Sequence, residues 1–330
     1  MNSTFKAITV EKGIDKLYSI SVKKRNINDL PDADLLIKVN YSSLNYKDAL
    51  SSRGNIGVTK KYPHTPGIDA VGLIESSKSE NFKIGQEVIV SGYDLGMNTP
   101  GGFGEYVRVP SSWVCLLPEN LTAKESMAIG TGGLTAGLCV QKLKKLNGID
   151  GKNAVVTGAT GGVGSFAIKL LKLLGARVTA ITTKPDQKDY LKILEADQII
   201  SKKDFISSDR KPLGNGIWDI AVDSVGGDIL SNLIPQMKYG GVITCCGNVA
   251  GPSFNATVYP FILRANHLVG IDSAEAPISI KSEIWNKFAS EWYIDDIDNL
   301  YKSVSINEIV PEIEKILNGK QIGRVLLNHR

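Results

Sequence analysis

Between residues 35 and 109 apolar and polar positions alternate in short runs, a pattern that predicts β-strands. The runs are LLIKVNYSSL (35–44), AVGLI (70–74), EVIVSG (87–92) and EYVRV (105–109). Turn-forming stretches such as YPHTPG (62–67) and GMNTPGG (96–102) lie between them. The chain up to about Pro118 is therefore predicted to form a compact, mainly β domain.

From Thr122 the apolar positions take a helical spacing in ESMAIG (125–130) and LTAGLCVQKLKKL (134–146), and strands then alternate with helices. Strands are predicted at 153–157, 176–181, 198–201, 217–222, 240–246 and 267–272. This alternation predicts a doubly wound parallel sheet. Residues 306–320 predict an amphipathic helix closed by Gly319, and 323–330 a last strand that returns to the first domain.

The segment 153–181 joins a β-branched strand to a glycine-rich turn and an amphipathic helix. Its A-x-G-x-x-G motif consists of Ala159, Gly161 and Gly164. In a dinucleotide-binding loop the second position lets the backbone approach a pyrophosphate, and the third lets helix and strand pack closely. The predicted phosphate-binding residues are Thr160, Gly161, Gly162, Val163 and Gly164. The second domain is therefore predicted to be a Rossmann domain.

The residues after the second predicted strand indicate which cofactor is bound. NAD-specific domains place a carboxylate there to bind the ribose 2′-hydroxyl. This chain has Thr182, Thr183 and Lys184, and its first carboxylate is Asp186. Two hydroxyls and an ammonium attract a 2′-phosphate, which favours NADPH. The alternative is that Lys184 is an ordinary solvated lysine.

Over its whole length the sequence resembles the medium-chain dehydrogenase/reductases, and within them the zinc-independent quinone oxidoreductases of the acryloyl-CoA reductase/YhdH type. The motifs that carry the resemblance are SSLNYKDAL (42–50), HTPGIDAVG (64–72), GGFGEYVRVP (101–110), MAIGTGGLTAGLCV (127–140), VVTGATGGVG (155–164), VDSVGG (222–227), YPFILRANHLVGIDS (259–273) and IGRVLL (322–327).

The resemblance implies an α/β protein in which a GroES-like, mainly β catalytic domain (1–121 and 300–330) accompanies a Rossmann NADP-binding domain (122–299). It implies hydride transfer from NADPH, without zinc, to an activated C=C bond of an enoyl thioester or enone, or to a quinone. Two alternatives stay open: a broad-range quinone reductase, and a zeta-crystallin-like protein that binds NADPH without turnover. A homodimer joined partly through 259–272 is also implied.

By resemblance, Tyr46 and Asn45 lie beside the nicotinamide in a cleft between the domains. Tyr46 is expected to hold the cofactor, orient the acceptor or donate a proton, since a phenol both donates and accepts. Asp48 is expected to have either a structural or a catalytic role. The cofactor contacts implied are Thr182, Thr183, Lys184 and Lys202 at the 2′-phosphate, Gly247 and Asn248 at the ribose or pyrophosphate, and Ile271 and Ser273 at the nicotinamide. Arg324 is expected either to contact a phosphate or to be a surface arginine.

No metal is predicted. Metal-dependent relatives have a Cys near position 45 and a His in a GHE triplet, where this chain has Asn45 and Ile68. The chain has three histidines, none at ligand spacing with another His or a Cys. Its four cysteines form no CxxC pair, so a disulfide framework is not expected either.

Charge and hydrophobicity exclude several classes of partner. Lys and Arg number 38 against 34 Asp and Glu, and they are spread along the chain, so nucleic acid is not an expected partner. No apolar stretch approaches the ~18 residues of a membrane span, and the N-terminal sequence is unlike a secretory signal. A cytoplasmic enzyme acting on a small molecule is expected.

Overall fold

The computed structural model describes residues 4–14, 17–206 and 211–330, which form two compact units. Unit 1 comprises residues 1–131 and 273–330, and unit 2 comprises residues 132–272. The predicted boundaries differ, because 122–131 and 273–299 were expected in the nucleotide-binding domain and belong to unit 1.

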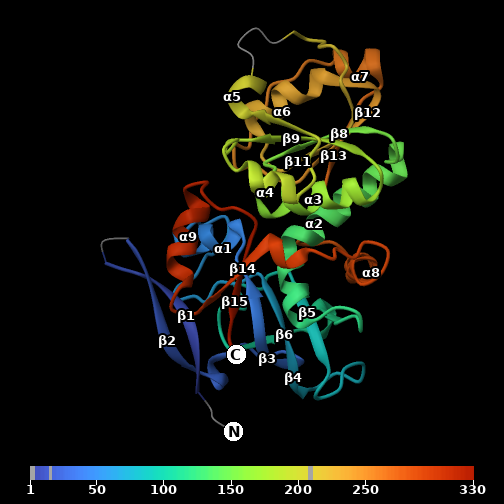
Figure 1. Ribbon diagram of the computed structural model, residues 1–330. Coiled ribbons are helices and arrows are strands. Elements are labelled where there is room, and N and C mark those ends of the chain that lie inside the picture. The colour runs from blue at the N-terminus through green and yellow to red at the C-terminus, as the bar shows by residue number, and fades with distance from the viewer. Residues whose placement is uncertain (1–3, 15–16, 207–210) are drawn as a thin grey trace. The chain divides into compact units, whose positions relative to one another are not determined.

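Unit 1 is built on a mixed sheet and a separate hairpin (Figure 1). The hairpin pairs β1 (Thr4–Lys12) with β2 (Tyr18–Asn26). The sheet order is β14 (Tyr301–Ser305), β15 (Arg324–Asn328), β3 (Leu35–Ser43), β4 (Asp69–Ser77), β5 (Glu87–Ser91) and β7 (Val114–Leu116), with β6 (Tyr106–Val109) also paired to β3. Strand β15 runs antiparallel to β3, so the predicted return of the last strand to the first domain is confirmed.

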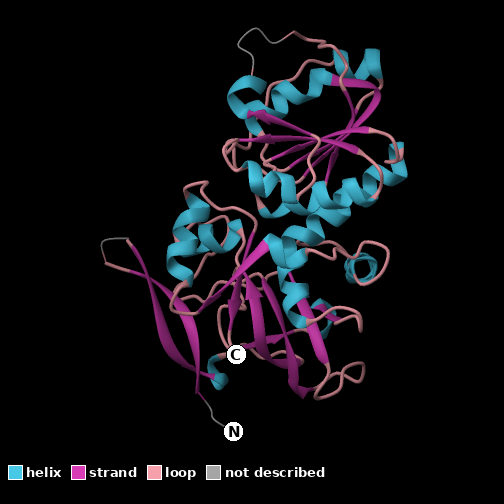
Figure 2. Ribbon diagram, in the orientation of Figure 1, coloured by secondary structure: helices cyan, strands magenta, loops and turns pink. Residues whose placement is uncertain are grey.

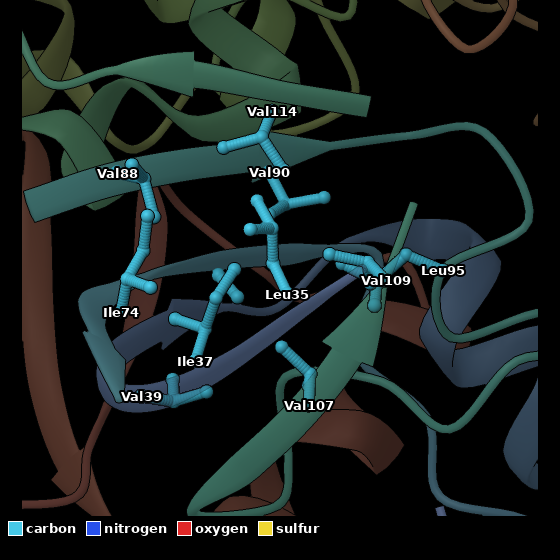
Figure 3. Packing of buried hydrophobic residues seen from close by; sticks show 11 residues of the cluster. Leu35, Ile37, Val39, Ile74, Val88, Val90, Leu95, Val107, Val109 and Val114 are labelled. Atoms are coloured by element: carbon cyan, nitrogen blue, oxygen red, sulfur yellow. The ribbon is translucent and has the colours of Figure 1, made fainter. Parts of the chain in front are cut away.

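Alternate residues of these strands form the core of unit 1. Leu35, Ile37 and Val39 point to the same side of β3, because successive strand side chains face opposite sides. Figure 3 shows them packed with residues from the neighbouring strands: Ile74, Val88, Val90, Leu95, Val107, Val109 and Val114.

The helices of unit 1 are α1 (Tyr46–Ser52), α8 (Ile278–Phe288) and α9 (Ile309–Leu317). Helix α8 accounts for part of the boundary difference, since its Ser282 Oγ lies 3.2 Å from the Cys115 Sγ of β7 and its Lys281 Nζ donates to the Ser91 carbonyl oxygen. The sequence pattern of strand followed by helix continues past residue 272, so it did not reveal this change of partner. Short 3-10 helices lie at Ile27–Asp29, Ser111–Trp113, Ile234–Gln236 and Ile297–Leu300.

Unit 2 is a six-stranded parallel sheet with helices on both faces (Figures 1 and 2). Its strand order is β10 (Gln198–Ser201), β9 (Arg177–Thr182), β8 (Asn153–Thr157), β11 (Trp218–Asp223), β12 (Met237–Cys245) and β13 (His267–Gly270). All six predicted strands are present, and the doubly wound Rossmann topology is confirmed.

The helices of unit 2 are α3 (Gly162–Leu173), α4 (Lys188–Ile193), α5 (Lys202–Phe205), α6 (Gly227–Leu233) and α7 (Tyr259–Arg264). Helix α2 (Ala123–Asn147) begins in unit 1 and continues into unit 2, and Gly130 interrupts it with φ 47° and ψ −161°. In the described ranges of the chain, no helix has both the length and the apolarity required to cross a bilayer.

Candidate active site

The glycine-rich loop joins β8 to α3 in the predicted way. Gly158 has φ +63°, and Gly161 caps the N-terminus of α3. A Cβ at Gly164 would lie 2.3 Å from the Gly158 carbonyl oxygen, so only glycine permits this approach of helix to strand. The loop thus directs the free N–H groups of the α3 N-terminus beyond the end of β8, an arrangement suited to a phosphate.

Thr160, Thr182 and Lys184 come together beside this loop. The Lys184 backbone N–H donates to Thr182 Oγ1 over 3.0 Å, and its Nζ lies 3.4 Å from Thr160 Oγ1. The two threonine hydroxyls lie 3.4 Å apart and both residues are buried. Lys184 is half-buried, and this burial lowers its pKa. A cation and two hydroxyls therefore converge where the sequence predicted a phosphate group.

The other predicted cofactor residues of unit 2 differ in their exposure and in their contacts. Thr183 is exposed, and Lys202 opens α5 without a hydrogen bond to the Thr160, Thr182 and Lys184 group in the described residues. Gly247 follows β12, and a Cβ there would lie 2.0 Å from the Ser224 carbonyl oxygen. The next residue, Asn248, is exposed.

Two further predicted contacts follow β13. The backbone N–H of Ile271 donates to the Cys245 carbonyl oxygen over 3.0 Å. Ile271 therefore lies at the carboxyl edge of the parallel sheet, as Gly247 and the glycine-rich loop do. Ser273 is the first residue of the second segment of unit 1.

In unit 1 the predicted catalytic residues lie at the junction of β3 and α1. Asn45 occupies the N-cap position of α1, and Tyr46 is its first residue. The Asp48 carboxylate is fully buried and accepts hydrogen bonds from the backbone N–H groups of Asn45 (2.8 Å), Gly67 (3.0 Å) and Ile68 (2.9 Å). Burial, assisted by the nearby Asp69, raises the Asp48 pKa to about 7. Asp48 thus holds the Asn45–Tyr46 turn against the start of β4.

A second buried carboxylate, Asp69, fixes the Asn45 side chain. Asp69 Oδ2 accepts from Asn45 Nδ2 (2.8 Å), Ser43 Oγ (2.6 Å) and the Thr131 N–H (2.8 Å). The Thr131 hydroxyl donates to Asp69 Oδ1 over 2.7 Å. One carboxylate therefore binds the segment before α1 and the residue at which α2 leaves unit 1.

Arg324 completes this network and is only 4% exposed. Its Nη1 donates to Asn45 Oδ1 (3.0 Å), its Nη2 to Ser43 Oγ (2.8 Å) and its Nε to the Ala128 carbonyl oxygen (3.2 Å). Nη2 also lies 3.7 Å from Asp69 Oδ2. The surface-arginine alternative for Arg324 is wrong, because its guanidinium is buried at the sheet. Its partners in the structure are protein groups, and its contact with a phosphate stays a prediction.

Tyr46 differs from its neighbours in its hydrogen bonding. Its side chain is partly exposed, and within the described ranges of the chain its hydroxyl has no hydrogen-bond partner. The polar atoms of Asn45 and Asp48, by contrast, are engaged inside the protein. The geometry leaves Tyr46 as the predicted catalytic residue that can offer a polar group to a ligand.

Two of the three histidines have rings that hydrogen-bond to backbone carbonyl groups. His64 and His329 each place Nε2 on a carbonyl oxygen, of Gly96 (2.8 Å) and Gly102 (2.9 Å) respectively. Burial lowers the pKa of both rings. Within residues 4–14, 17–206 and 211–330, no three His, Cys, Asp or Glu side chains are grouped to hold a metal ion.

Ser43 and Thr131, which share the Asp69 carboxylate, were not among the predicted site residues. Both lie in motifs that carried the family resemblance, SSLNYKDAL and MAIGTGGLTAGLCV. A hydroxyl in a predicted buried strand, for Ser43, or between two apolar helical segments, for Thr131, was the available signal, since buried hydroxyls need partners.

Comparison with known proteins places this geometry in a family. The profile described as "Alcohol dehydrogenase GroES-like domain" matches residues 31–119, and "Zinc-binding dehydrogenase" matches residues 162–290. AcuI of Ruegeria pomeroyi, an acrylyl-CoA reductase, is 36% identical over 98% of this chain and 99% of its own.

Solved structures of the same group of proteins superpose closely on this chain. The yhdH oxidoreductase of Salmonella enterica, in complex with NADP, superposes with a TM-score of 0.94 at 35% identity, covering 98% of this chain and all of its own. The yhfP protein of Bacillus subtilis, with NAD bound, gives a TM-score of 0.94 at 39% identity over 99% of this chain and all of its own. The chain therefore belongs to the medium-chain dehydrogenase/reductases, in the quinone oxidoreductase group that includes the YhdH, YhfP and acrylyl-CoA reductase proteins.

Proposed function

We propose that this protein is an NADPH-dependent oxidoreductase that reduces an activated C=C bond, of an enoyl thioester such as acrylyl-CoA or of an enone. Its similarity to AcuI over nearly the full length of both chains supports the substrate class. The observation that carries the proposal is the buried frame of Asp48, Asp69 and Arg324, which fixes the Asn45–Tyr46 turn, while the Tyr46 hydroxyl has no partner among the residues that the structure describes.

NADPH, when bound, supplies a hydride to the β-carbon of the acceptor, and the charge that develops on the carbonyl oxygen needs a hydrogen-bond donor. In this proposal the Tyr46 hydroxyl donates to that oxygen or delivers the proton that the α-carbon requires. Asn45 and Asp48 act as positioning residues, because their side-chain atoms are engaged with Arg324, Asp69 and backbone N–H groups.

The residues of unit 2 fit the cofactor. The glycine-rich loop would hold the pyrophosphate, and Thr160, Thr182 and Lys184 the 2′-phosphate, with Thr183 and Lys202 at the rim. Gly162, Val163, Gly247, Asn248 and Ile271 would line the remainder, and Ser273 of unit 1 would approach the nicotinamide. A related structure holds NADP and another holds NAD, so the charge beside the ribose is the feature that decides this chain's preference.

A quinone is the second candidate acceptor. YhfP, 39% identical over 99% of this chain, carries a quinone oxidoreductase name. A quinone needs the same hydride and a donor for one oxygen, which the Tyr46 hydroxyl can also supply. The experiment that separates the two is steady-state turnover with NADPH and acrylyl-CoA, a simple enone or 1,4-benzoquinone, compared by kcat/KM. NADPH binding without turnover of any of them would favour the zeta-crystallin-like alternative.

The Tyr46→Phe variant tests the role of the hydroxyl directly. If the hydroxyl is a required acid, kcat with the thioester should fall about 10²–10⁴-fold with NADPH affinity little changed. Tyr62→Phe is the matched control, since the Tyr62 hydroxyl donates to the Ser51 carbonyl oxygen at the end of α1 and has no role in the proposal. Equal kinetics of Tyr46→Phe and the wild type would return Tyr46 to a packing role.

We also propose that the protein is a cytoplasmic homodimer. Strand β13 is an edge of its sheet, and the preceding α7 exposes Ile262 (68%) and Leu263 (57%), features that suit pairing with a second copy. All four cysteines are free thiols, which a reducing compartment maintains.

A further inference from the structure

Lys281 in α8 is an unusual residue because its side chain is almost fully buried, at 1% exposure. Lysines are rarely buried to this extent, since an ammonium taken out of water must find other partners. Lys281 Nζ donates to the carbonyl oxygens of Ser91 (2.7 Å) and Ala274 (2.8 Å) and lies 3.4 Å from the centre of the Tyr93 ring. Its partners come from the end of β5 and from the first residues of the second segment of unit 1.

Tyr93 joins the same two segments. Its N–H donates to the Ala274 carbonyl oxygen over 3.0 Å, and its hydroxyl to the Ala276 carbonyl oxygen over 3.0 Å. Its backbone has φ +53°, a conformation that a residue with a side chain adopts rarely and that its surroundings must stabilise. The ring also stacks on Trp113, at 5.7 Å between centroids.

The backbones approach closely at this point. A Cβ on Gly92 would lie 2.9 Å from both the Cα and the carbonyl oxygen of Ala274, so the two chains are in direct contact. The Gly92 N–H donates to the Ile68 carbonyl oxygen over 2.8 Å, and the Ile68 N–H donates to Asp48. Lys281, Tyr93 and Ala274 form a group that we call the Lys281 cluster. A short path of hydrogen bonds thus runs from this cluster to the Asn45–Asp48 turn.

The chain passes from unit 2 into unit 1 between Asp272 and Ser273. We propose that Lys281 is a positioning residue, which with Tyr93 fixes the segment Ser273–Ala276 onto the end of β5 and so fixes the backbone of Ser273 for the reaction. The inference that this fixed segment supports turnover rests on the proposed function, in which Ile271 and Ser273 lie by the nicotinamide.

Lys281→Met distinguishes positioning from a role in stability. Methionine keeps an unbranched side chain in the same space and removes the buried charge, but the Ser91 and Ala274 carbonyl oxygens lose a donor, so the melting temperature should fall somewhat. The Ala274 carbonyl oxygen then loses the ammonium and keeps the Tyr93 N–H, a weaker donor. We expect the Tyr93 amide to exchange with solvent at least about tenfold faster, because one charge-assisted bond is lost.

Turnover is the second measurement. At saturating NADPH and at a temperature where the variant is fully folded, Lys281→Met should lower kcat about tenfold. Lys287→Met is the matched control on the same helix, since Lys287 pairs with Glu291 (2.7 Å) and lies over the Trp292 ring, outside the cluster. Lys281→Arg, which keeps the charge, should recover part of kcat.

The outcomes separate the two proposals. A wild-type protein without turnover on any acceptor would defeat the proposed function, and exchange at Tyr93 would still decide whether Lys281 fixes the segment. If the Tyr93 amide exchanges at the wild-type rate in Lys281→Met, Lys281 does not fix the segment Ser273–Ala276. If exchange is faster but kcat equals that of the wild type, the fixed segment does not contribute to turnover. If Lys281→Met does not fold, Lys281→Gln removes the charge and keeps a polar side chain, and the same two measurements on it decide the proposal in the same way.

Discussion

The cofactor preference can be tested at one side chain, Lys184. Lys184→Met removes the ammonium and keeps most of the aliphatic length that fills the half-buried position. We expect NADPH to bind the wild type at least about tenfold more tightly than NADH, and the variant to lose most of that difference. NADH affinity should change little, since NADH has no 2′-phosphate for the ammonium to bind.

The magnitude follows from the contacts of Lys184. Its Nζ contacts Thr160 Oγ1 at 3.4 Å, a weak interaction, so little is lost when it turns to a phosphate oxygen. Charge-assisted hydrogen bonds contribute about 1.5–3 kcal/mol, and partial exposure places this one near the lower end. About 1.4 kcal/mol corresponds to a tenfold change in Kd.

The pH dependence provides a second test of the same group. The 2′-phosphate binds the charged form of Lys184, and burial lowers the pKa of that group below the usual 10.5. The preference for NADPH should therefore weaken as the pH rises, and at a lower pH than an exposed lysine would give. The variant should show no such pH dependence.

The assay is fluorescence titration with both cofactors at fixed ionic strength. Lys192→Met is the control, because Lys192 lies on the neighbouring α4 with its side chain 76% exposed. Equal Kd values of the wild type for NADPH and NADH would refute the assignment of the 2′-phosphate site. An equal loss of affinity for both cofactors in Lys184→Met would refute the role of Lys184.

Three other predictions concern the site, the metal and the assembly. The pKa of Asp48 is raised from 3.8 to about 7 in the folded protein, so its contribution to stability is present below pH 3.8 and is lost as pH rises to 7. The melting temperature should therefore fall between pH 3.8 and 7, and Asp48→Asn should remove the part of this fall that Asp48 causes. The purified protein should contain no stoichiometric zinc by elemental analysis and should retain its activity after chelation. Sedimentation at micromolar concentration should give twice the mass of one 35.6 kDa chain, and Leu263→Glu, at the exposed end of α7, should give the monomer mass.

The elements of the fold were predictable because their signals are local. Strands such as Asn153–Thr157 and Gln198–Ser201 are short apolar runs between turn residues, and both were predicted at their observed bounds. The boundary after residue 272 depends on contacts between α8 and strands more than 150 residues earlier in the chain. Nothing in the α8 sequence identifies that partner.

The candidate site also has a part that the sequence predicts and a part that it does not. The Asn45–Asp48 turn and the glycine-rich loop are contiguous motifs, so sequence reasoning could find them. Arg324 is different, since it meets Asn45 and Ala128 through the pairing of β15 with β3. A lone arginine before a strand carries no sign of such partners, which is why a phosphate and the surface were the alternatives considered.

The Asp69–Arg324 pair is costly to bury, and this cost bears on its role. Replacing a buried ion pair with apolar residues is often neutral or stabilising, whereas removing one partner costs about 3–5 kcal/mol. The pair is therefore better explained by the geometry that it sets than by its contribution to stability. Here the two charges direct both polar atoms of the Asn45 amide, Oδ1 to Arg324 and Nδ2 to Asp69, so one orientation of the residue before Tyr46 is fixed. The same carboxylate also accepts hydrogen bonds from the N–H and the hydroxyl of Thr131, so it joins the segment before Tyr46 to the residue at which α2 leaves unit 1.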